Sequence, residues 1–283
     1  MLRFATFLAP SMEPFYAWVA ETVAFRLGTT AELHVGVDYA ELPDGRADVA
    51  FLCGLPYVHL ADVPDPWVVP VAAPILTGDR YGGRPIYFSD VIVREDSGFT
   101  SFGDLRGGTW AFNEPDSQSG FGVVRAHLAR LGETGGYFGR VVEAGFHDTA
   151  IRLVAEGAVD AAAIDSQVLA IVRRDEPELA GVLRVIETLG PSTIQPVVAA
   201  SRLPGAVIAS VRAALVGLAD DPAASAPLSR GLLARFAPVT DADYDDIRRM
   251  EAEADAGMVG FGMPWDSLVA GYISDPGRPT PMT

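Results

Sequence analysis

The sequence has no lysine and only one cysteine, Cys53. Its 21 cationic residues are therefore all arginines, against 37 acidic residues, and the formal net charge is −16. Without a lysine ammonium, the chain cannot use a P-loop or a Schiff-base lysine. Without a second cysteine, it cannot form an intrachain disulfide or a multi-cysteine metal site. No basic stripe is present, so nucleic acid is not expected as a partner.

Long apolar runs are also absent. No stretch approaches the roughly 20 apolar residues that cross a bilayer, so we do not expect an integral membrane protein. The start has one cation and a brief apolar run before Pro10. This run is shorter than the h-region of a secretory signal and predicts a first buried strand. Two locations stay open: the cytoplasm, if Met1 is the true start, and the periplasm or cell surface, if an export signal was removed.

The composition is that of a folded chain, with 283 residues, 49% hydrophobic and 20% charged. Short β-branched or apolar runs alternate with segments of helical period, which is typical of an α/β protein with mainly parallel sheets. Strands are expected at 2–8, 31–36, 47–52, 67–73, 86–94, 109–113, 139–144, 159–164, 182–187 and 194–200. Helices are expected at 12–27, 119–131, 147–156, from 166, and at 203–218, 225–235 and 241–257.

The glycine-rich interval 77–85 predicts a junction between two lobes. We expect one lobe to contain residues 1–85 and 191–283, and the other to contain residues 86–190. The chain would cross twice between them. Loops at the carboxyl ends of strands in both lobes would then face a cleft, which is where ligands bind in open α/β sheets.

The most informative segment is 110–121, a strand followed by a polar turn and an amphipathic helix. Ser117, Gln118 and Ser119 lie where this helix begins. Free N–H groups, the positive end of the helix dipole and two hydroxyls would converge there, which favours an oxyanion. The alternative is ordinary capping by one of the serines, with nothing bound.

Other residues are weaker candidates for the same cleft. His147 begins a later helix and could donate to an anion or be purely structural. Tyr39 follows one strand and Tyr87 opens another, so each could offer a hydroxyl or simply pack. The other histidines share no metal-ligand spacing, and no nucleophile with its base can be identified. We therefore predict no metal, no cofactor and no catalytic residues.

The order of segments resembles a known family. The matching stretches are 38–40, 47–52, 87–93, 101–107, the Asn-Glu-Pro-Asp-Ser-Gln-Ser-Gly-Phe run at 113–121, 145–147, 157–162, 165–166 and 196–198. In this order they resemble the phosphate, phosphite and phosphonate substrate-binding proteins of ABC transporters. The resemblance implies a two-lobed type II periplasmic-binding-protein fold with two interlobe crossings and a ligand cleft between the lobes.

The resemblance also assigns site residues. It implies that Ser117, Gln118 and Ser119 form the turn that grips the phosphoryl oxygens, that Tyr39 and Tyr87 close over the ligand, and that His147 adds a contact. Gln118 departs from the threonine usual in the family. Gln167 and Gln195 stand where relatives that bind aminophosphonates have acids, so this comparison predicts a ligand without an obligatory cationic tail.

The main hypothesis is a non-catalytic solute-binding protein. It would bind phosphate, phosphite, a phosphonate or a phosphate ester for uptake by an ABC transporter permease or for sensing. One alternative is a cytoplasmic enzyme of the same fold that acts on a small anionic metabolite. Another is a diverged member whose cleft is only an interaction surface.

Overall fold

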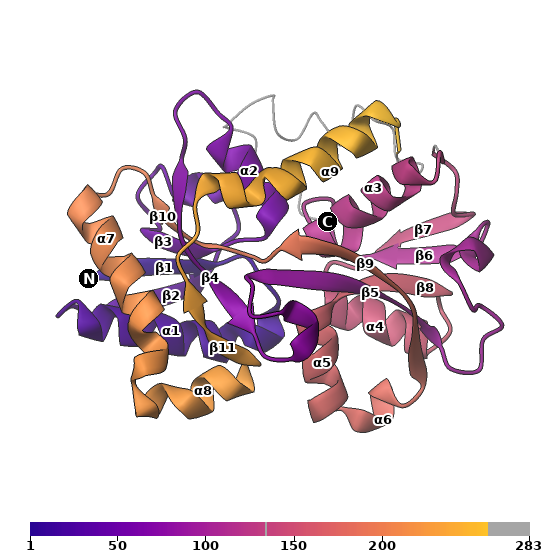
Figure 1. Ribbon diagram of the computed structural model, residues 1–283, viewed down its shortest axis with the longest axis horizontal. Coiled ribbons are helices and arrows are strands. Elements are labelled where there is room, and N and C mark those ends of the chain that lie inside the picture. The colour runs from indigo at the N-terminus through magenta and orange to yellow at the C-terminus, as the bar shows by residue number, and fades with distance from the viewer. Residues whose placement is uncertain (134, 260–283) are drawn as a thin grey trace.

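The computed structural model describes residues 1–133 and 135–259. Two β-sheets lie side by side, and helices cover both (Figure 1). Residues 260–283, which the sequence assigns to the first lobe, lie outside the described residues. No helix in the described part of the chain is long and apolar enough to cross a membrane.

The first sheet has the strand order β11-β4-β10-β3-β1-β2. Its strands are β1 (Leu2–Thr6), β2 (Ala31–Val35), β3 (Val49–Phe51), β4 (Val68–Leu76), β10 (Val197–Ala200) and β11 (Leu233–Ala237). Its helices are α1 (Glu13–Arg26), α2 (Gly54–Ala61), α7 (Gly205–Val216) and α8 (Ser225–Arg230). All residues of β3 and β10 are buried, because helices cover both faces of the sheet centre.

The second sheet has the strand order β7-β6-β8-β5-β9. Its strands are β5 (Ile86–Arg94), β6 (Thr109–Phe112), β7 (Arg140–Glu143), β8 (Ala161–Asp165) and β9 (Leu183–Thr193). Its helices are α3 (Val123–Arg130), α4 (His147–Ala155), α5 (Ser166–Asp175) and α6 (Pro177–Ala180). In α4 the buried residues recur three or four positions apart, so one helical face packs on the sheet.

The chain passes between the sheets twice. It leaves the first sheet after β4 and enters the second at β5, and it returns from β9 to β10. Strands β5 and β9 pair in antiparallel orientation along most of their lengths, so the two connecting segments lie next to each other. The result is a two-lobed α/β fold with two crossings, as the sequence predicted.

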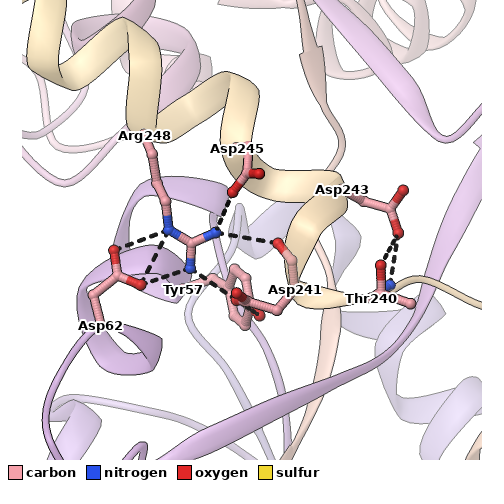
Figure 2. Close-up of polar contacts among 7 residues, drawn as sticks. All are labelled: Tyr57, Asp62, Thr240, Asp241, Asp243, Asp245 and Arg248. Carbon is pink, nitrogen blue, oxygen red and sulfur yellow. Dashed lines mark hydrogen bonds and ion pairs between the residues drawn. The ribbon is translucent and has the colours of Figure 1, made fainter.

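Helix α9 (Asp245–Ala256) lies across both lobes (Figure 1). Towards the first lobe, Arg248 contacts three carboxylates, with distances of 2.6 Å to Asp62, 2.8 Å to Asp241 and 3.0 Å to Asp245 (Figure 2). Towards the second lobe, the guanidinium of Arg125, on α3, donates to Asp255 at 2.9 Å. Because α9 is bonded to elements of both lobes, it connects them in addition to the two crossings of the chain.

Two expectations about secondary structure are wrong. The sheets are mixed rather than mainly parallel, since β4, β5, β9, β10 and β11 all take part in antiparallel pairs. The helix expected at 225–235 ends at Arg230, and β11 follows it. Gly231 closes the helix, and Leu232 has a φ of 59°, which turns the chain back so that β11 pairs with β4.

Candidate functional site

The turn after β6 is the centre of the candidate site. Ser117, Gln118 and Ser119 are all at most 2% exposed, and a short π-helical segment, Gln118–Gly122, follows Ser117 and leads into α3. The hydroxyl of Ser117 accepts the N–H of Gly120 at 3.0 Å, so Ser117 does cap the helix. A Cβ on Gly120 would lie 1.9 Å from Oδ1 of Asn113, so only glycine fits this packing.

Ser119 and His147 meet within the second lobe. Oγ of Ser119 lies 2.8 Å from Nε2 of His147 and 3.4 Å from Oγ of Ser117. His147 is the first residue of α4, where the buried face of that helix holds its ring in the interior. Burial lowers the pKa of His147 to about 4, so the imidazole is neutral at pH 7. The structure therefore brings together three of the residues that the sequence singled out.

Tyr87 is the second residue of β5 and is fully buried. Burial raises the pKa of its hydroxyl well above the usual value. The Ser119 side chain lies near enough to oppose this shift, but its position does not give a hydrogen bond of acceptable geometry to the Tyr87 hydroxyl. Among the described residues, the Tyr87 hydroxyl, Nδ1 of His147 and Oδ1 of Asn113 are buried without a hydrogen-bond partner. Each such atom destabilises the protein by about 1–3 kcal/mol, a cost that a bound polar ligand can remove.

Tyr39 lies on a cavity of about 250 Å³ that both lobes line. Its walls are Thr6, Phe7, Leu8, Pro10, Glu13, Val35, Gly36, Val37, Asp38 and Tyr39 from the first lobe, and Glu114, Asp116 and Phe146 from the second. Asp116 and Phe146 directly precede Ser117 and His147 in the chain, so the cavity borders the buried turn. Tyr39 thus approaches the site from the opposite lobe.

The cavity next to Tyr39 is acidic. Burial, with smaller contributions from Asp116 and Glu114, raises the pKa of the Tyr39 hydroxyl. Burial, together with the charges of Asp116 and Glu143, raises the pKa of Glu114 to about 7. Glu114 and Asp116 were not among the site residues predicted from the sequence, although they lie within the same turn as Ser117. Their place just before the serines was the available signal.

The side chain of Gln118 supports the turn. Its Nε2 lies 3.2 Å from Oγ of Ser192 and 3.2 Å from Sδ of Met250, and its backbone N–H donates to Sγ of Cys53 at 3.3 Å. The amide that replaces the family's threonine therefore reaches β9 and α9. Ser192 and Met250 are 74 and 132 residues away along the chain, and nothing in the sequence indicates these contacts.

Gln167 and Gln195 line a different cavity, of about 20 Å³, whose walls are otherwise mostly apolar. Nε2 of Gln167 donates to the carbonyl oxygen of Gly231 at 2.6 Å, and Nε2 of Gln195 donates to Oδ2 of Asp165 at 2.5 Å. Asp165 also caps α5 by accepting the N–H of Gln167. Neither glutamine lines the cavity that contains Tyr39.

In the described residues, no group of three or more histidine, cysteine or acidic side chains could hold a metal ion. The donors gathered around Ser119 are hydroxyls, backbone N–H groups and a neutral imidazole. Groups of this kind bind the oxygens of an oxyanion through several hydrogen bonds at once.

Comparison with solved structures identifies similar folds. A binding protein component of an ABC phosphonate transporter from Pseudomonas aeruginosa matches with a TM-score of 0.78 and 18% identity, over 96% of this chain and 92% of that one. PhnD1 from Prochlorococcus marinus, in complex with methylphosphonate, matches with a TM-score of 0.78 and 17% identity, over 90% and 98%. An ancestral arginine-binding protein bound to arginine matches with a TM-score of 0.54 and 17% identity, over 81% and 96%.

These matches confirm the type II periplasmic-binding-protein fold that the sequence predicted. A family model described as "ABC transporter, phosphonate, periplasmic substrate-binding protein" matches residues 4–244, which is most of the chain. The chain therefore belongs to the periplasmic substrate-binding proteins of phosphonate ABC transporters.

Proposed function

We propose that this chain binds a small phosphoryl-type oxyanion in its interlobe cleft and delivers it to an ABC transporter permease. The candidate ligands are phosphate, phosphite, a phosphonate and a phosphate ester. The observation that carries the proposal is the buried group of Ser117, Ser119, Tyr87 and His147, which combines hydroxyls and an imidazole with unpartnered polar atoms. The family match and the methylphosphonate in PhnD1 support the same ligand class.

The binding residues proposed are Ser117, Gln118, Ser119, Tyr39, Tyr87 and His147. Ser117 and Ser119 would donate their hydroxyls, and Gln118 would contribute through the turn that its side chain holds in place. Tyr39 would close the site from the first lobe. Hydrogen bonds to a charged group contribute about 1.5–3 kcal/mol each, so a few of them suffice for tight binding.

Gln167 and Gln195 are also proposed as residues of the site, because the cavity that they line and the cavity beside Tyr39 share Leu8 as a wall. Their amides are already bonded to Gly231 and Asp165, and the cavity they line, of about 20 Å³, has room for about one water molecule. We expect them to limit the size of the ligand on this side and to make no direct bond to its phosphoryl oxygens.

We further propose that the site carries out no reaction. Within the site, the pair that most resembles a nucleophile with its base is Ser119 and His147, whose Oγ and Nε2 atoms lie 2.8 Å apart. An imidazole with a pKa of about 4 is a weak general base, and among the described residues its Nδ1 has no carboxylate to orient it. These features favour binding without catalysis.

The proposed lobe boundaries follow the crossings, with residues 1–85 and 191–283 in one lobe and 86–190 in the other. In this arrangement the serine turn and His147 belong to the second lobe, and Tyr39 to the first. Closure of the lobes would exclude water from the site and strengthen its hydrogen bonds. We also propose a location outside the cytoplasm, because the family that the chain matches consists of periplasmic substrate-binding proteins of ABC transporters.

A ligand panel tests the proposal. Thermal unfolding is measured with phosphate, phosphite, methylphosphonate, 2-aminoethylphosphonate, phosphate monoesters and sulfate at equal ionic strength. A true ligand at 100 times its Kd stabilises the folded protein by about 2.7 kcal/mol. We expect at least one phosphoryl compound to do so, and sodium chloride at the same ionic strength to have no such effect. If no phosphoryl compound at millimolar concentration raises the Tm of the folded protein, the proposal is wrong.

A further inference from the structure

The groups proposed to hold the oxyanion carry no positive charge. In the described part of the chain, the side chains of Ser117, Ser119 and His147 bond to one another and to the N–H of Gly120, and the Ser119 side chain also interacts with Tyr87. His147 stays neutral because burial lowers its pKa to about 4. The ligand therefore meets neutral donors, so hydrogen bonds alone must compensate the desolvation of each of its negative charges, and this cost rises with the second charge.

The charged groups next to these donors are acidic. Asp165, 2% exposed, acts electrostatically on Tyr87, Cys53 and Tyr16, and Asp246 acts on Tyr87. Glu114 and Asp116 line the cavity that contains Tyr39 and act on its hydroxyl. Carboxylates from β8 and α9 thus act on Tyr87, and carboxylates of the serine turn act on Tyr39.

The nearby cations are already paired with carboxylates. Arg80 donates to both carboxylate oxygens of Asp90, at 2.8 and 2.9 Å, and Asp90 is the acid that acts on Asp165. His59, on which Asp116 acts, lies 2.6 Å from Glu251. Neither Arg80 nor His59 lines the cavity that contains Glu114, Asp116 and Tyr39.

We propose that the site binds its phosphoryl ligand as a singly charged anion and selects against the doubly charged form. This inference rests on the proposed function and specifies the substrate class: phosphoryl acids that keep one proton, or monoesters of phosphonates, which have a single acidic proton and so cannot carry a second charge. A second charge would enter a buried site beside carboxylates, and none of the described residues that line the adjoining cavity is a cation, so its desolvation would not be recovered.

If the site binds only the singly charged ligand, the affinity for a phosphoryl acid must fall as the pH rises. An acid that binds only with one charge loses about tenfold in affinity per pH unit above its second pKa, because the binding form becomes scarce. Asp165, with a pKa raised to about 6 by burial, and Glu114, with a pKa of about 7, also lose protons as the pH rises. Their charges would weaken the binding of every anion, so a ligand of fixed charge is needed as a reference.

Titration calorimetry with two matched ligands separates these effects. Methylphosphonate passes from one to two charges between pH 6 and pH 9, while its O-methyl ester keeps one charge. At constant ionic strength we expect the affinity for methylphosphonate to fall relative to that for the ester, by about tenfold per pH unit above the second pKa. An affinity for methylphosphonate that is constant or rises with pH would overturn the inference, whether or not the ester binds.

Two protein variants complete the test. Asp165→Asn keeps a capping side chain at the start of α5, and Glu114→Gln keeps the size of the side chain, while each removes one carboxylate. In both, we expect methylphosphonate to bind more tightly at pH 8.5 than it does to the unchanged protein, with the loss per pH unit retained. If neither variant binds methylphosphonate more tightly at pH 8.5 than the unchanged protein does, the carboxylates do not disfavour the second charge and the inference is wrong. If methylphosphonate binds at no pH, the proposed function itself fails.

Discussion

Replacing Ser119 by alanine should weaken binding of the phosphoryl ligand by about ten- to a hundredfold, or about 1.5–3 kcal/mol. The hydroxyl of Ser119 lies 2.8 Å from Nε2 of His147 and 3.4 Å from the hydroxyl of Ser117, at the centre of the proposed site. Its removal deletes one donor and leaves the imidazole without a hydrogen-bond partner at Nε2. Both changes act on the bound oxyanion.

The measurement is titration calorimetry with the best ligand from the panel. Ser210→Ala is the matched control, because Ser210 is exposed on α7 and donates its hydroxyl to the carbonyl oxygen of Ala206. The control should bind as the unchanged protein does. The Tm of each free variant shows separately whether the fold is intact. A folded Ser119→Ala protein with unchanged affinity would mean that the anion binds elsewhere.

The second large effect is expected for Tyr87→Phe, which should change stability and affinity in opposite directions. The Tyr87 hydroxyl is buried without a hydrogen-bond partner among the described residues, so its removal should stabilise the ligand-free protein by about 1 kcal/mol. The same change removes a donor to the ligand and should lower affinity by about tenfold or more. A hydroxyl retained only for packing would not produce this combination.

Tyr81→Phe is the matched control for this pair of effects. Tyr81 is also buried, but its hydroxyl donates to Oγ of Ser166 at 3.2 Å. Its removal breaks a satisfied hydrogen bond and should destabilise the free protein by about 1 kcal/mol. Denaturant unfolding of the two free variants and calorimetry of their complexes give the four values needed. If Tyr87→Phe destabilises the free protein as Tyr81→Phe does, the role proposed for Tyr87 is wrong.

Much of the fold could be predicted because local patterns agree with it. Apolar runs at β1, β3, β5 and β8 lie in buried strands, and helical periods at α1 and α7 lie on helices that cover a sheet. The short strand β11 escaped prediction because its residues follow α8 without a proline and continue an apolar pattern. The antiparallel pairing of β10 with β3 and β4, and of β11 with β4, depends on the return of the chain from the second lobe, which a local pattern does not contain.

The candidate site, too, was predictable where local sequence marks it and not where it depends on contacts between distant segments. The serine turn and His147 each begin a helix, and the local sequence marks helix starts well, so the sequence could select them. Their contact at 2.8 Å joins segments 28 residues apart, and only the sheet order β7-β6-β8 explains it. Gln167 and Gln195 were selected through the family pattern alone, and their amides bond to Gly231 and Asp165 in a separate small cavity.

The acidic residues around the candidate site could not be predicted from the sequence for a different reason. With 37 acidic residues in the chain, the sequence cannot show which of them face the site. The structure distinguishes Asp165 by its burial and its electrostatic interaction with Tyr87, and Glu114 and Asp116 by their interaction with Tyr39 in the cavity that they line. The positions of these three side chains, rather than the net charge of the chain, therefore bear on the charge of the ligand.

The most direct test of the account is a crystal structure of the protein with methylphosphonate. We expect the phosphorus to lie between the two lobes, with its oxygens within about 3.2 Å of the hydroxyls of Ser119 and Tyr87. A phosphonate bound away from these groups, with the Tyr87 hydroxyl still buried and unpartnered, would contradict the claim that the serine turn of the second lobe is the oxyanion site.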